Sequence, residues 1–386
     1  MNFDIPSFRF SVPTEIIFGS GVFMELGAHA AKLGSNPLIV TGRRSARESG
    51  LLERALEQLP GAHVFDAIDE NPDTALCERG ARFCADHACD VVVAIGGGSP
   101  IDAAKAIAVL ARNSGPCASF FGAEKYAHAP LPIVAAPTTA GTGSEVTPYA
   151  VIVDAEERAK RTVSGAALFP RIALLDPGLT RSLPRSTTIS TGFDALSQAL
   201  EGIVSKKSTP MGDALALDAI RRVRAFLPAA ARGDSDTARA QLLYAAMLSG
   251  CVIAQSGTTL VHGMGYHYTL ECGIAHGLAN ALLLTPLFIH NARHAPEKTA
   301  AIAAALGAST ADPGRTIARS LHELFVELGV SPAARDHGCR IEQLEPFAAN
   351  VASEPYRYRN QIGEITASTI LGFYRQSFHG YLSEVQ

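Results

Sequence analysis

The stretch that most constrains the fold is DVVVAIGGGSPIDAAKAIA, residues 90–108. A run of β-branched residues leads into the GGGS turn at 96–99, and Pro100 then opens a helix, where proline is favoured. Glycines let the backbone approach a ligand closely, and the free N–H groups at the start of a helix attract an anion. The segment therefore predicts a buried strand, a tight turn and a helix, an arrangement that suits a pyrophosphate. The alternative is a tight strand–helix turn in which the glycines serve only the backbone conformation and bind no ligand.

Strand and helix patterns alternate through the first half of the chain. Short apolar runs that end in Gly, Pro, Asp or Asn predict strands at 37–42, 63–68, 90–98, 131–139 and 172–177. Amphipathic stretches predict helices between them, at 45–58, 72–88 and 101–113. This alternation is typical of a parallel sheet covered on both faces. We therefore predict an α/β dinucleotide-binding domain with a parallel sheet over residues 1–184.

After Pro184 the pattern changes to Ala- and Leu-rich stretches with helical spacing, and convincing strands stop. The predicted helices cover 187–205, 210–230, 236–256, 297–306 and 313–328, with a loop at 228–236. We therefore predict an all-α C-terminal domain over residues 185–386.

Composition limits the classes of partner. The chain has 386 residues and a formal net charge of −4, with no basic tract longer than pairs such as Arg43-Arg44 and Lys206-Lys207, which argues against nucleic acid. Its seven cysteines fit neither a disulfide framework nor a zinc ribbon, as expected for reduced thiols in the cytoplasm. The start MNFDIPSFRFS does not match a signal peptide, and no apolar run is long enough to cross a membrane.

A second glycine-rich loop follows the predicted strand at 131–139. The segment PTTAGTGSEVTPYAVI, residues 137–152, supplies Thr138, Thr139, Ser144 and Thr147. Two such loops at the carboxyl ends of neighbouring strands are where open α/β sheets bind nucleotides. Their spacing differs from GxGxxG, so this is not the usual Rossmann fingerprint.

Four motifs together resemble one known family. GGGSPIDAAK, APTTAGTGSEVT, LLDPGLTRSLP…TGFDALSQALE and HG…HGLANALLLTP are similar to those of the iron-containing (group III) alcohol dehydrogenases, and they occur in the same order. The similarity extends to about residue 295, and the tail from about residue 330 matches only loosely. The resemblance implies a dinucleotide-binding domain, a helical domain, and NAD(P)-dependent hydride transfer between a nicotinamide and a small alcohol or aldehyde.

The same resemblance assigns the cofactor residues. It places Gly97, Gly98 and Ser99 at the pyrophosphate. The residues that it places along the rest of the cofactor groove are Asp102, Thr138, Thr139, Thr147 and Lys160.

The end of the first predicted strand bears on the choice between NAD and NADP. Relatives that prefer NAD have an Asp there, whereas this chain has Gly42 followed by Arg43, Arg44 and Ser45. The lost carboxylate and the added guanidinium groups favour a 2′-phosphate. We therefore expect NADP(H) to be preferred over NAD(H), although both arginines would also suit a solvated helix start.

The family's metal site combines an Asp and a His four residues apart with two later histidines fourteen residues apart. Asp194 matches the first ligand, His262 and His276 match the last two, and Gln198 stands where the second ligand should be. Three alternatives remain open: a three-ligand site, a weak fourth ligand from the Gln198 amide, or a metal-free site in which His262 or His276 donates a proton. We favour a bound divalent metal, iron(II) or zinc.

Helical periodicity alone gives a different interpretation of this segment. The apolar residues of its helix recur on one stripe: Ile189, Phe193, Leu196, Leu200 and Ile203. Asp194, Gln198 and Glu201 lie opposite that stripe, which without the family resemblance is typical of an exposed helix face.

Two further segments bear on the substrate. Many relatives carry a second histidine four residues after the first, and here Tyr266 takes that place, with His267 next to it. We take both as candidate catalytic residues, the alternative being a buried tyrosine and a surface histidine. Arg357 and Arg359 in the segment YRYRNQ could bind an anionic group on an aldehyde, or could belong to an exposed loop or an interface.

Two other activities compete with the alcohol dehydrogenase. One is a metal-independent, maleylacetate reductase-like reduction of an oxo acid. The other is a dehydroquinate-synthase-like lyase, which needs a cluster of basic residues that the motif segments lack. The partners expected from the family are a small alcohol or aldehyde, anionic ones included, and further copies of the chain in a homodimer or larger oligomer.

Overall fold

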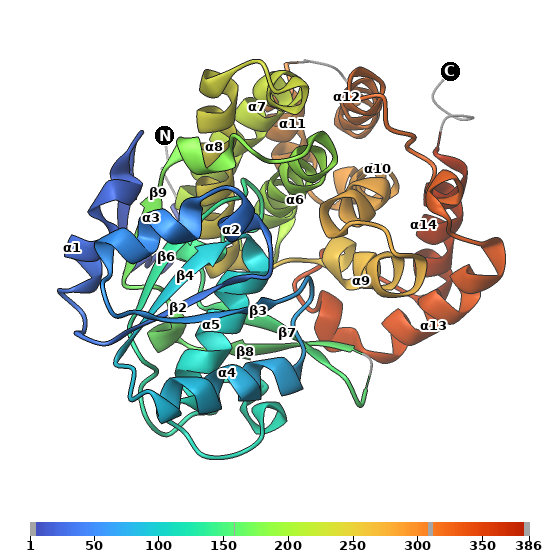
Figure 1. The fold of residues 1–386 in the computed structure, drawn as a ribbon. Helices are drawn as coiled ribbons and strands as arrows, with labels where there is room; N and C mark the ends of the chain where they lie inside the picture. Colours follow the sequence, from blue (N-terminus) through green and yellow to red (C-terminus); the bar gives the residue numbers. More distant parts are fainter. Residues whose placement is uncertain (1–4, 158, 308–311, 382–386) are drawn as a thin grey trace. The chain divides into compact units, whose positions relative to one another are not determined.

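The computed structural model describes residues 5–157, 159–307 and 312–381. The chain divides into two compact units (Figure 1). Val12–Leu183 forms an α/β unit, and Pro184–Gln386 together with Met1–Ser11 forms a helical unit. The predicted fold class, a parallel α/β sheet domain followed by a helical part, is confirmed.

The α/β unit is built on a sheet of six parallel strands in the order β1-β9-β6-β4-β2-β3. In that order the strands are β1 (Glu15–Phe18), β9 (Ile172–Leu175), β6 (Ile133–Pro137), β4 (Val91–Gly96), β2 (Pro37–Gly42) and β3 (His63–Ile68). All five predicted strands are present, and β1 adds a sixth at the edge of the sheet.

Helices cover both faces of this sheet, because successive side chains of a strand point to opposite faces. Leu38 and Val92 pack toward α4 (Thr74–Asp86) and α5 (Gly98–Leu110). Ile39 and Val93 pack toward the other set of helices. That set comprises η1 (Val22–Glu25), α1 (Leu26–Ala30), α2 (Ser45–Glu48), α3 (Leu51–Gln58) and η5 (Pro177–Thr180). The predicted helix at 45–58 is therefore two helices, separated at Gly50, whose φ of 70° is left-handed.

A small second sheet was not predicted from the sequence. It joins β7 (Tyr149–Asp154) and β8 (Ala159–Ser164) as an antiparallel pair, with β5 (Gly122–Ala123) parallel to β8. The remaining 3-10 helices of the unit are η2 (Cys117–Phe120), η3 (Ser144–Val146) and η4 (Ala166–Leu168).

The strand order puts a topological switch point between β2 and β4. The chain passes from β2 to its neighbour β3 in one direction and from β4 to β6 in the other. Open α/β sheets bind ligands outside the carboxyl ends of the strands at such a point. Here those ends carry Gly42 and the GGGS turn at 96–99.

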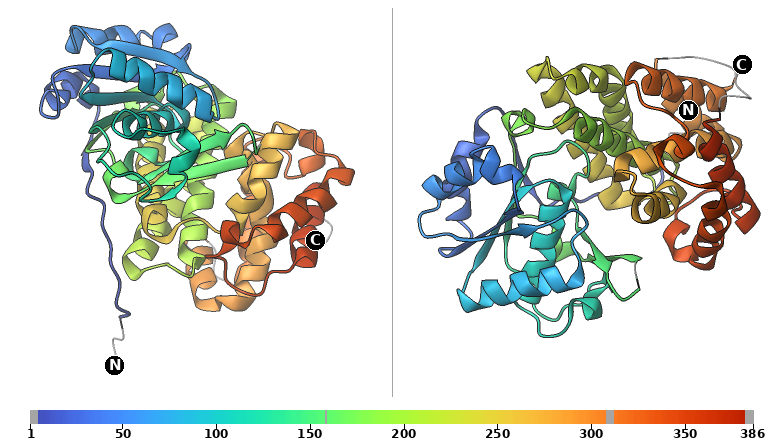
Figure 2. Two further views of the ribbon diagram at one scale, coloured as in Figure 1. Left: turned by 90° about the horizontal axis from the view of Figure 1, so that it is seen from below. Right: turned by 45° about the vertical axis from the view of Figure 1, so that its right-hand side comes forward.

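The helical unit is a bundle in which α6 packs against α7, α8 and α10. Its longer helices are α6 (Arg185–Val204), α7 (Pro210–Arg232), α8 (Asp236–Ser256), α9 (Leu260–Cys272), α10 (His276–His294), α11 (Pro296–Ala305), α12 (Pro313–Glu327), α13 (Leu344–Ser353) and α14 (Ala367–His379). Its 3-10 helices are η6 (Ala334–His337), η7 (Ile341–Gln343) and η8 (Pro355–Tyr358). Figures 1 and 2 show α13 and α14, which pack together, side by side in red.

The predicted bounds of the loop at 228–236 are wrong, because the loop between α7 and α8 is shorter. α7 continues through Pro228 to Arg232 and ends at Gly233, which has a φ of 82°. Proline inside a helix removes one backbone hydrogen bond. The buried Leu227 and Ala230 on either side of it hold the helix in place by packing.

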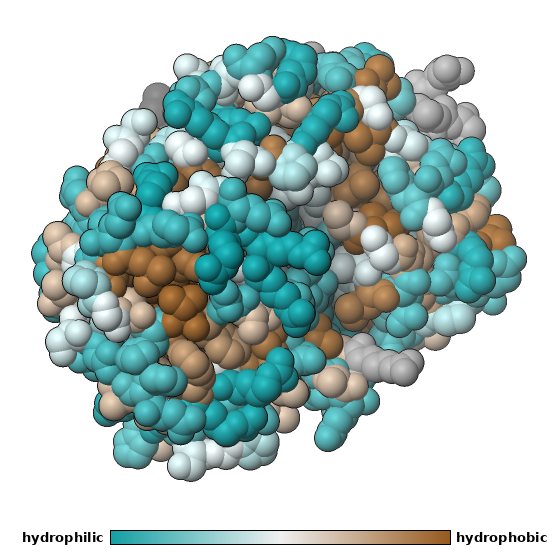
Figure 3. Space-filling model, in the orientation of Figure 1, coloured by the Kyte–Doolittle hydropathy of each residue, from teal (hydrophilic) through white to brown (hydrophobic). Residues whose placement is uncertain are grey.

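α8 is long and apolar enough, by length and composition, to cross a membrane. However, 72% of its apolar window is buried inside the protein, as in the core helix of a bundle. The face in Figure 3 is mainly hydrophilic, with separate hydrophobic patches.

Candidate functional site

Three helices of the helical unit bring Asp194, His262 and His276 together. His262 Nε2 lies 3.5 Å from Asp194 Oδ1, and His276 Nε2 lies 3.8 Å from the same oxygen. One ligand atom from each residue lies within 4.8 Å of the other two. A carboxylate with two imidazoles suits zinc or iron(II), and the three side chains therefore fit a divalent metal.

Glycines next to the histidines explain how the helices come so close. A Cβ at Gly277 would overlap the carbonyl oxygen of Ser190 and lie 2.8 Å from the backbone nitrogen of Asp194. A Cβ at Gly265 would overlap Asn280 Oδ1. α10 therefore starts directly against α6, with α9 close beside it, because these positions lack side chains.

The polar face of α6 is buried, so its interpretation as an exposed face is wrong. Asp194 and Gln198 are each 3% exposed, and Glu201 is 0% exposed. The periodicity of α6 separated polar from apolar residues correctly. It could not show that further helices cover the polar side as well.

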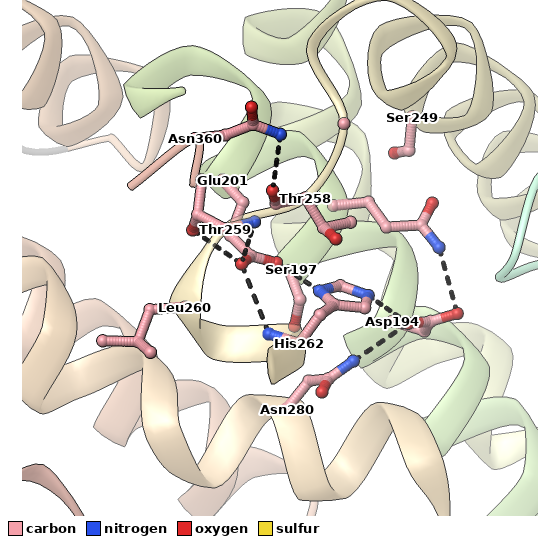
Figure 4. A network of polar contacts seen from close by, with 12 residues as sticks. Asp194, Ser197, Glu201, Ser249, Thr258, Thr259, Leu260, His262, Asn280 and Asn360 are labelled. Carbon is pink, nitrogen blue, oxygen red and sulfur yellow. Dashed lines mark hydrogen bonds and ion pairs between the residues drawn. The ribbon is translucent and has the colours of Figure 1, made fainter. Parts of the chain in front are cut away.

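Glu201 orients His262 and was not recognised as a site residue from the sequence. Its Oε1 accepts hydrogen bonds from the backbone nitrogen of Thr259 at 2.8 Å and from Thr259 Oγ1 at 2.7 Å. Its Oε2 contacts His262 Nδ1, so that Nε2 faces Asp194 (Figure 4). Histidine ligands commonly use their second nitrogen in this way. The available signal was the spacing of seven residues from Asp194, two turns along the same helix face.

Two amide side chains hold the carboxylate of Asp194. Gln198 Nε2 donates to Oδ2 at 3.2 Å. Asn280 Nδ2 donates to Oδ1 at 3.3 Å (Figure 4). Gln198 therefore lies at the site, with its amide nitrogen toward Asp194. Asn280, one turn after His276, was not identified from the sequence.

In the α/β unit, the two glycine-rich loops lie against each other. A Cβ at Gly97 would lie 3.0 Å from Thr139 Cγ2, and one at Gly98 would lie 2.6 Å from Thr142 Cγ2. Thr138 donates its backbone N–H to the carbonyl of Gly96 at 2.9 Å. The missing side chains of the turn therefore make room for the second loop.

The other groove residues expected from the sequence have different surroundings. Ser99 Oγ accepts a hydrogen bond from the backbone nitrogen of Asn71 at 3.3 Å. Asp102 accepts one from Ser144 Oγ at 2.5 Å, and the buried Thr147 accepts one from Lys105 Nζ at 3.2 Å. Asp102 and Thr147 thus face the inside of the loop, and Lys160 lies on β8.

The residues after β2 are exposed. The guanidinium of Arg43 forms an ion pair with Asp69 at 2.7 Å, in which both side chains are more than half exposed. Arg44 is also exposed, at the start of α2. A Cβ at Gly42 would make only ordinary contacts, 3.6 Å from the Ile68 carbonyl oxygen and 3.8 Å from Ser45 Oγ.

Family models match most of the chain. The model described as "Iron-containing alcohol dehydrogenase" matches residues 13–177, and that described as "Fe-containing alcohol dehydrogenase family, C-terminal" matches residues 188–378. The chain belongs to the iron-containing alcohol dehydrogenase family.

Similar proteins agree with this assignment. The NAD-dependent methanol dehydrogenase of Bacillus methanolicus is 30% identical over 89% of this chain and 92% of its own. A solved 1,3-propanediol oxidoreductase is 30% identical, with a TM-score of 0.92 over 97% of this chain and 100% of that chain. A sulfoacetaldehyde reductase from Bifidobacterium kashiwanohense, solved in complex with NAD+, is 30% identical, with a TM-score of 0.88 over 97% and 99% of the two chains.

As an iron-containing alcohol dehydrogenase, the protein is an oxidoreductase that transfers hydride between a nicotinamide cofactor and a small alcohol or aldehyde, assisted by a divalent metal. The comparisons favour this function over a metal-independent oxo-acid reductase and over a dehydroquinate-synthase-like lyase.

Electrostatic interactions in this dehydrogenase's Asp/His/His cluster are strong because Asp194 and His262 are buried, whereas His276 is half-buried. Burial raises the pKa of Asp194, but hydrogen bonds and charge from His262 and His276 outweigh it and lower that pKa overall. Burial lowers the pKa of His262, but the carboxylates of Glu201 and Asp194 outweigh it and raise that pKa to about 10. The cluster thus attracts positive charge, which a divalent cation would supply.

Tyr266 and His267, the two candidate catalytic residues on α9 of the dehydrogenase, have different neighbours. The Tyr266 ring stacks on that of His276, with centroids 5.6 Å apart and 17° between planes. His267 stacks on Phe347, with centroids 5.0 Å apart, and burial with the charge of Arg357 lowers its pKa to about 4. Only Tyr266 therefore adjoins the Asp/His/His cluster.

The two arginines of the YRYRNQ segment also differ. Arg357 forms an ion pair with Glu354, and its side chain is only 8% exposed. It lies next to α9, since a Cβ at Gly263 would be 3.4 Å from Arg357 Cβ. Arg359 is exposed.

Proposed function

We propose that this alcohol dehydrogenase holds its divalent metal, iron(II) or zinc, on Asp194, His262 and His276, with Gln198 orienting Asp194 through its amide nitrogen. The observation that carries the proposal is the convergence of one carboxylate oxygen and two imidazole nitrogens within 4.8 Å. When bound, the metal supplies a Lewis acid that polarises the substrate oxygen. An open coordination position is available in a site with three protein ligands.

The chain's own residues prepare this site. Glu201 keeps the Nδ1 side of His262 occupied, so Nε2 remains directed at the ligand cluster. Tyr266 lies along the ring of His276, and we propose that its ring borders the substrate. His267 takes part through the packing of α9 on α13 rather than through contact with the reacting atoms.

Elemental analysis of the purified protein, with activity measured before and after chelation, tests the metal site. We expect about one metal per chain, loss of activity on chelation, and recovery with iron(II) or zinc. Full activity in metal-free protein would overturn the proposal. In addition, Gln198→His should tighten metal binding by at least about tenfold, because it adds an imidazole ligand.

For the cofactor, we propose that Gly97, Gly98 and Ser99 contact the pyrophosphate. Further contacts come from Thr138, Thr139 and Lys160. Asp102 on α5 and Thr147 in the second loop act by holding that loop in place. The place of the turn at the switch point of the sheet, at the start of α5, supports this arrangement.

We also propose a preference for NADP(H) over NAD(H). The open space at Gly42 and the exposed guanidinium groups of Arg43 and Arg44 support binding of a 2′-phosphate. One observation favours NAD(H) instead: Asp69 places a carboxylate beside Arg43. This matters because a carboxylate near the adenosine ribose binds its hydroxyls and repels a 2′-phosphate.

Steady-state kinetics with both cofactors decide between them. We expect a higher kcat/KM with NADPH than with NADH, and a shift toward NADH in Gly42→Asp, which the backbone can accommodate without strain. Ser49→Asp serves as a charge-matched control, because Ser49 is an exposed residue directly after α2. A wild type that prefers NADH, or a Gly42→Asp variant with unchanged preference, would contradict the assignment.

The proposed substrates are small primary alcohols and their aldehydes, anionic aldehydes included. Three relatives of the chain are named for methanol, 1,3-propanediol and sulfoacetaldehyde. We propose that Arg357 or Arg359 attracts an anionic group. If Arg357→Ala and Arg359→Ala both leave the KM of anionic aldehydes unchanged, this part of the proposal is wrong.

We further propose that the protein acts in the cytoplasm as a homodimer or larger oligomer. No disulfide joins the seven cysteines, all of which lie in the described part of the chain, and this supports a reducing compartment. Light scattering of the purified protein measures the oligomeric state, and a monomer would contradict the second part.

A further inference from the structure

Lys105 is a completely buried lysine in α5, two turns after the glycine-rich turn. Its exposed fraction is 0%, which is rare for a lysine unless its charge is compensated. Its Nζ lies 2.7 Å from the Ser144 carbonyl oxygen, 2.8 Å from Ser144 Oγ, 3.2 Å from Thr147 Oγ1 and 2.6 Å from the Tyr149 carbonyl oxygen. Four acceptors satisfy the three hydrogens of an ammonium group.

Asp102, one turn earlier on α5, holds the same segment from a second point. Its carboxylate accepts hydrogen bonds from Ser144 Oγ at 2.5 Å and from the backbone nitrogen of Val151 at 3.0 Å. Lys105 Nζ lies 3.8 Å from Asp102 Oδ1. Two charged side chains on consecutive turns of α5 therefore fasten the segment 144–151 to this helix.

The fastened segment is the end of the second glycine-rich loop, whose beginning lies on the glycine-rich turn. Thr139 and Thr142 occupy the space left by the absent side chains of Gly97 and Gly98. The loop is thus held against α5 at its start by close packing and at its end by Lys105.

We infer that Lys105 is a positioning residue for cofactor binding, whose ammonium fixes the second glycine-rich loop beside the glycine-rich turn. This inference rests on the proposed cofactor site formed by those two loops. Lys105 does not touch the cofactor, since it is fully buried beneath the loop.

The burial of Lys105 and Asp102 supports a role in positioning the second glycine-rich loop, and not only in stabilising the fold. Removing an ammonium and a carboxylate from water is costly, and apolar residues of similar volume often give equal or greater stability. Hydrogen bonds to an ammonium nonetheless fix the directions of several oxygens at once, which apolar packing does not do. Two other charged groups interact electrostatically with this pair, Glu145 with Lys105 and Lys160 with Asp102.

Replacing Lys105 by methionine in the full-length protein tests the inference. We expect the dissociation constants of NADPH and NADH, measured by nucleotide fluorescence, to rise at least about tenfold in Lys105→Met. KM for the cofactor should rise in parallel, while kcat at saturating cofactor stays within about threefold of wild type. Lys125→Met, which removes an exposed lysine of the same unit, should bind both nucleotides like wild type.

A folded Lys105→Met protein with a lower Tm but unchanged nucleotide affinity would overturn the inference, because Lys105 would then only stabilise the fold. If Lys105→Met does not fold, Ser144→Ala decides instead. It removes only the hydroxyl that Asp102 and Lys105 share and leaves the backbone carbonyls in place. We expect about threefold or greater weakening of nucleotide binding in Ser144→Ala, and unchanged binding would overturn the inference.

Ser99→Glu separates this inference from the proposed cofactor site. The substitution places a negative charge at the glycine-rich turn, where Ser99 Oγ contacts Asn71 and not the residues that Lys105 binds. It should weaken nucleotide binding if the pyrophosphate lies there. Unchanged binding in Ser99→Glu, or no nucleotide binding by the wild type, would overturn the cofactor site and the inference together. Weakened binding in Ser99→Glu with wild-type affinity in Lys105→Met would overturn the inference alone.

Discussion

At the residue scale, Glu201 controls how His262 presents its ring to the metal site. We predict that Glu201→Gln weakens zinc binding by about 10- to 100-fold, because a neutral amide holds the imidazole less firmly than a carboxylate. Competition with a chelator of known affinity measures the change. Glu342→Gln, on an exposed 3-10 helix, is the matched control. An affinity within about threefold of wild type would mean that Glu201 serves only in packing.

Glu145 gives a pH-dependent prediction at the same scale. Burial raises its pKa from 4.5 to about 7, and the charge of Lys105 offsets only part of this rise. The folded protein therefore binds this proton more tightly than the unfolded chain. The resulting stability is fully present below pH 4.5 and is lost as the pH rises through about 7.

Glu145→Gln should remove this loss of stability. Between pH 4.5 and pH 8, the free energy of unfolding of wild type should fall relative to the variant by about 3 kcal/mol. Denaturant titrations at both pH values measure the difference. Glu156→Gln, an exposed neighbour, should keep the wild-type pH dependence, and an identical dependence in Glu145→Gln would contradict the prediction.

At the element scale, the contact between α6 and α10 sets the metal site. We predict that Gly277→Ala forces these helices apart, since its Cβ would meet the backbone at Ser190 and Asp194, and thereby moves His276 away from Asp194. Overpacking of this kind costs about 1–3 kcal/mol of stability. Zinc affinity should fall by at least about tenfold, because one of three ligands is displaced.

Gly372→Ala in α14 is the matched control for this helix contact. A Cβ there would meet no atom within 4 Å, so the substitution should leave zinc binding unchanged. It should raise the stability slightly, because alanine favours a helix over glycine by about 0.5–1 kcal/mol. Equal zinc affinities in Gly277→Ala and Gly372→Ala would contradict the role given to the glycine contact.

At the scale of the whole molecule, the two proposed binding functions belong to different units. The proposed cofactor residues all lie within Val12–Leu183, and the Asp/His/His cluster lies within Pro184–Gln386. We predict that chelated protein loses turnover but binds NADPH within about twofold of the untreated protein, as expected for independent sites. Nucleotide fluorescence before and after chelation measures this. A large loss of NADPH affinity would show that the metal supports cofactor binding.

Local patterns in the sequence predicted five of the six strands of the large sheet, all but β1. In the described part of the helical unit they predicted five of the nine longer helices and missed α9, α10, α13 and α14. They were weakest where tertiary contacts override local preference. α7 passes through Pro228 because its neighbours are packed on both sides, and β7 and β8 form a separate sheet that alternation of strands and helices does not indicate. The residue set Asp194, His262 and His276 was carried over from the resemblance to the iron-containing alcohol dehydrogenases, and the structure brings all three together.

The sequence by itself determined the α/β-then-helical order, the glycine-rich turn and the three cluster residues, because each is a local pattern or a fixed motif. Only the tertiary structure decided that Glu201 contacts His262, that Gln198 turns its amide nitrogen to Asp194, and that Lys105 holds the second glycine-rich loop against α5. The physical reason is that helical periodicity identifies residues that share a face. Whether that face meets water or another helix depends on contacts between residues far apart in the chain.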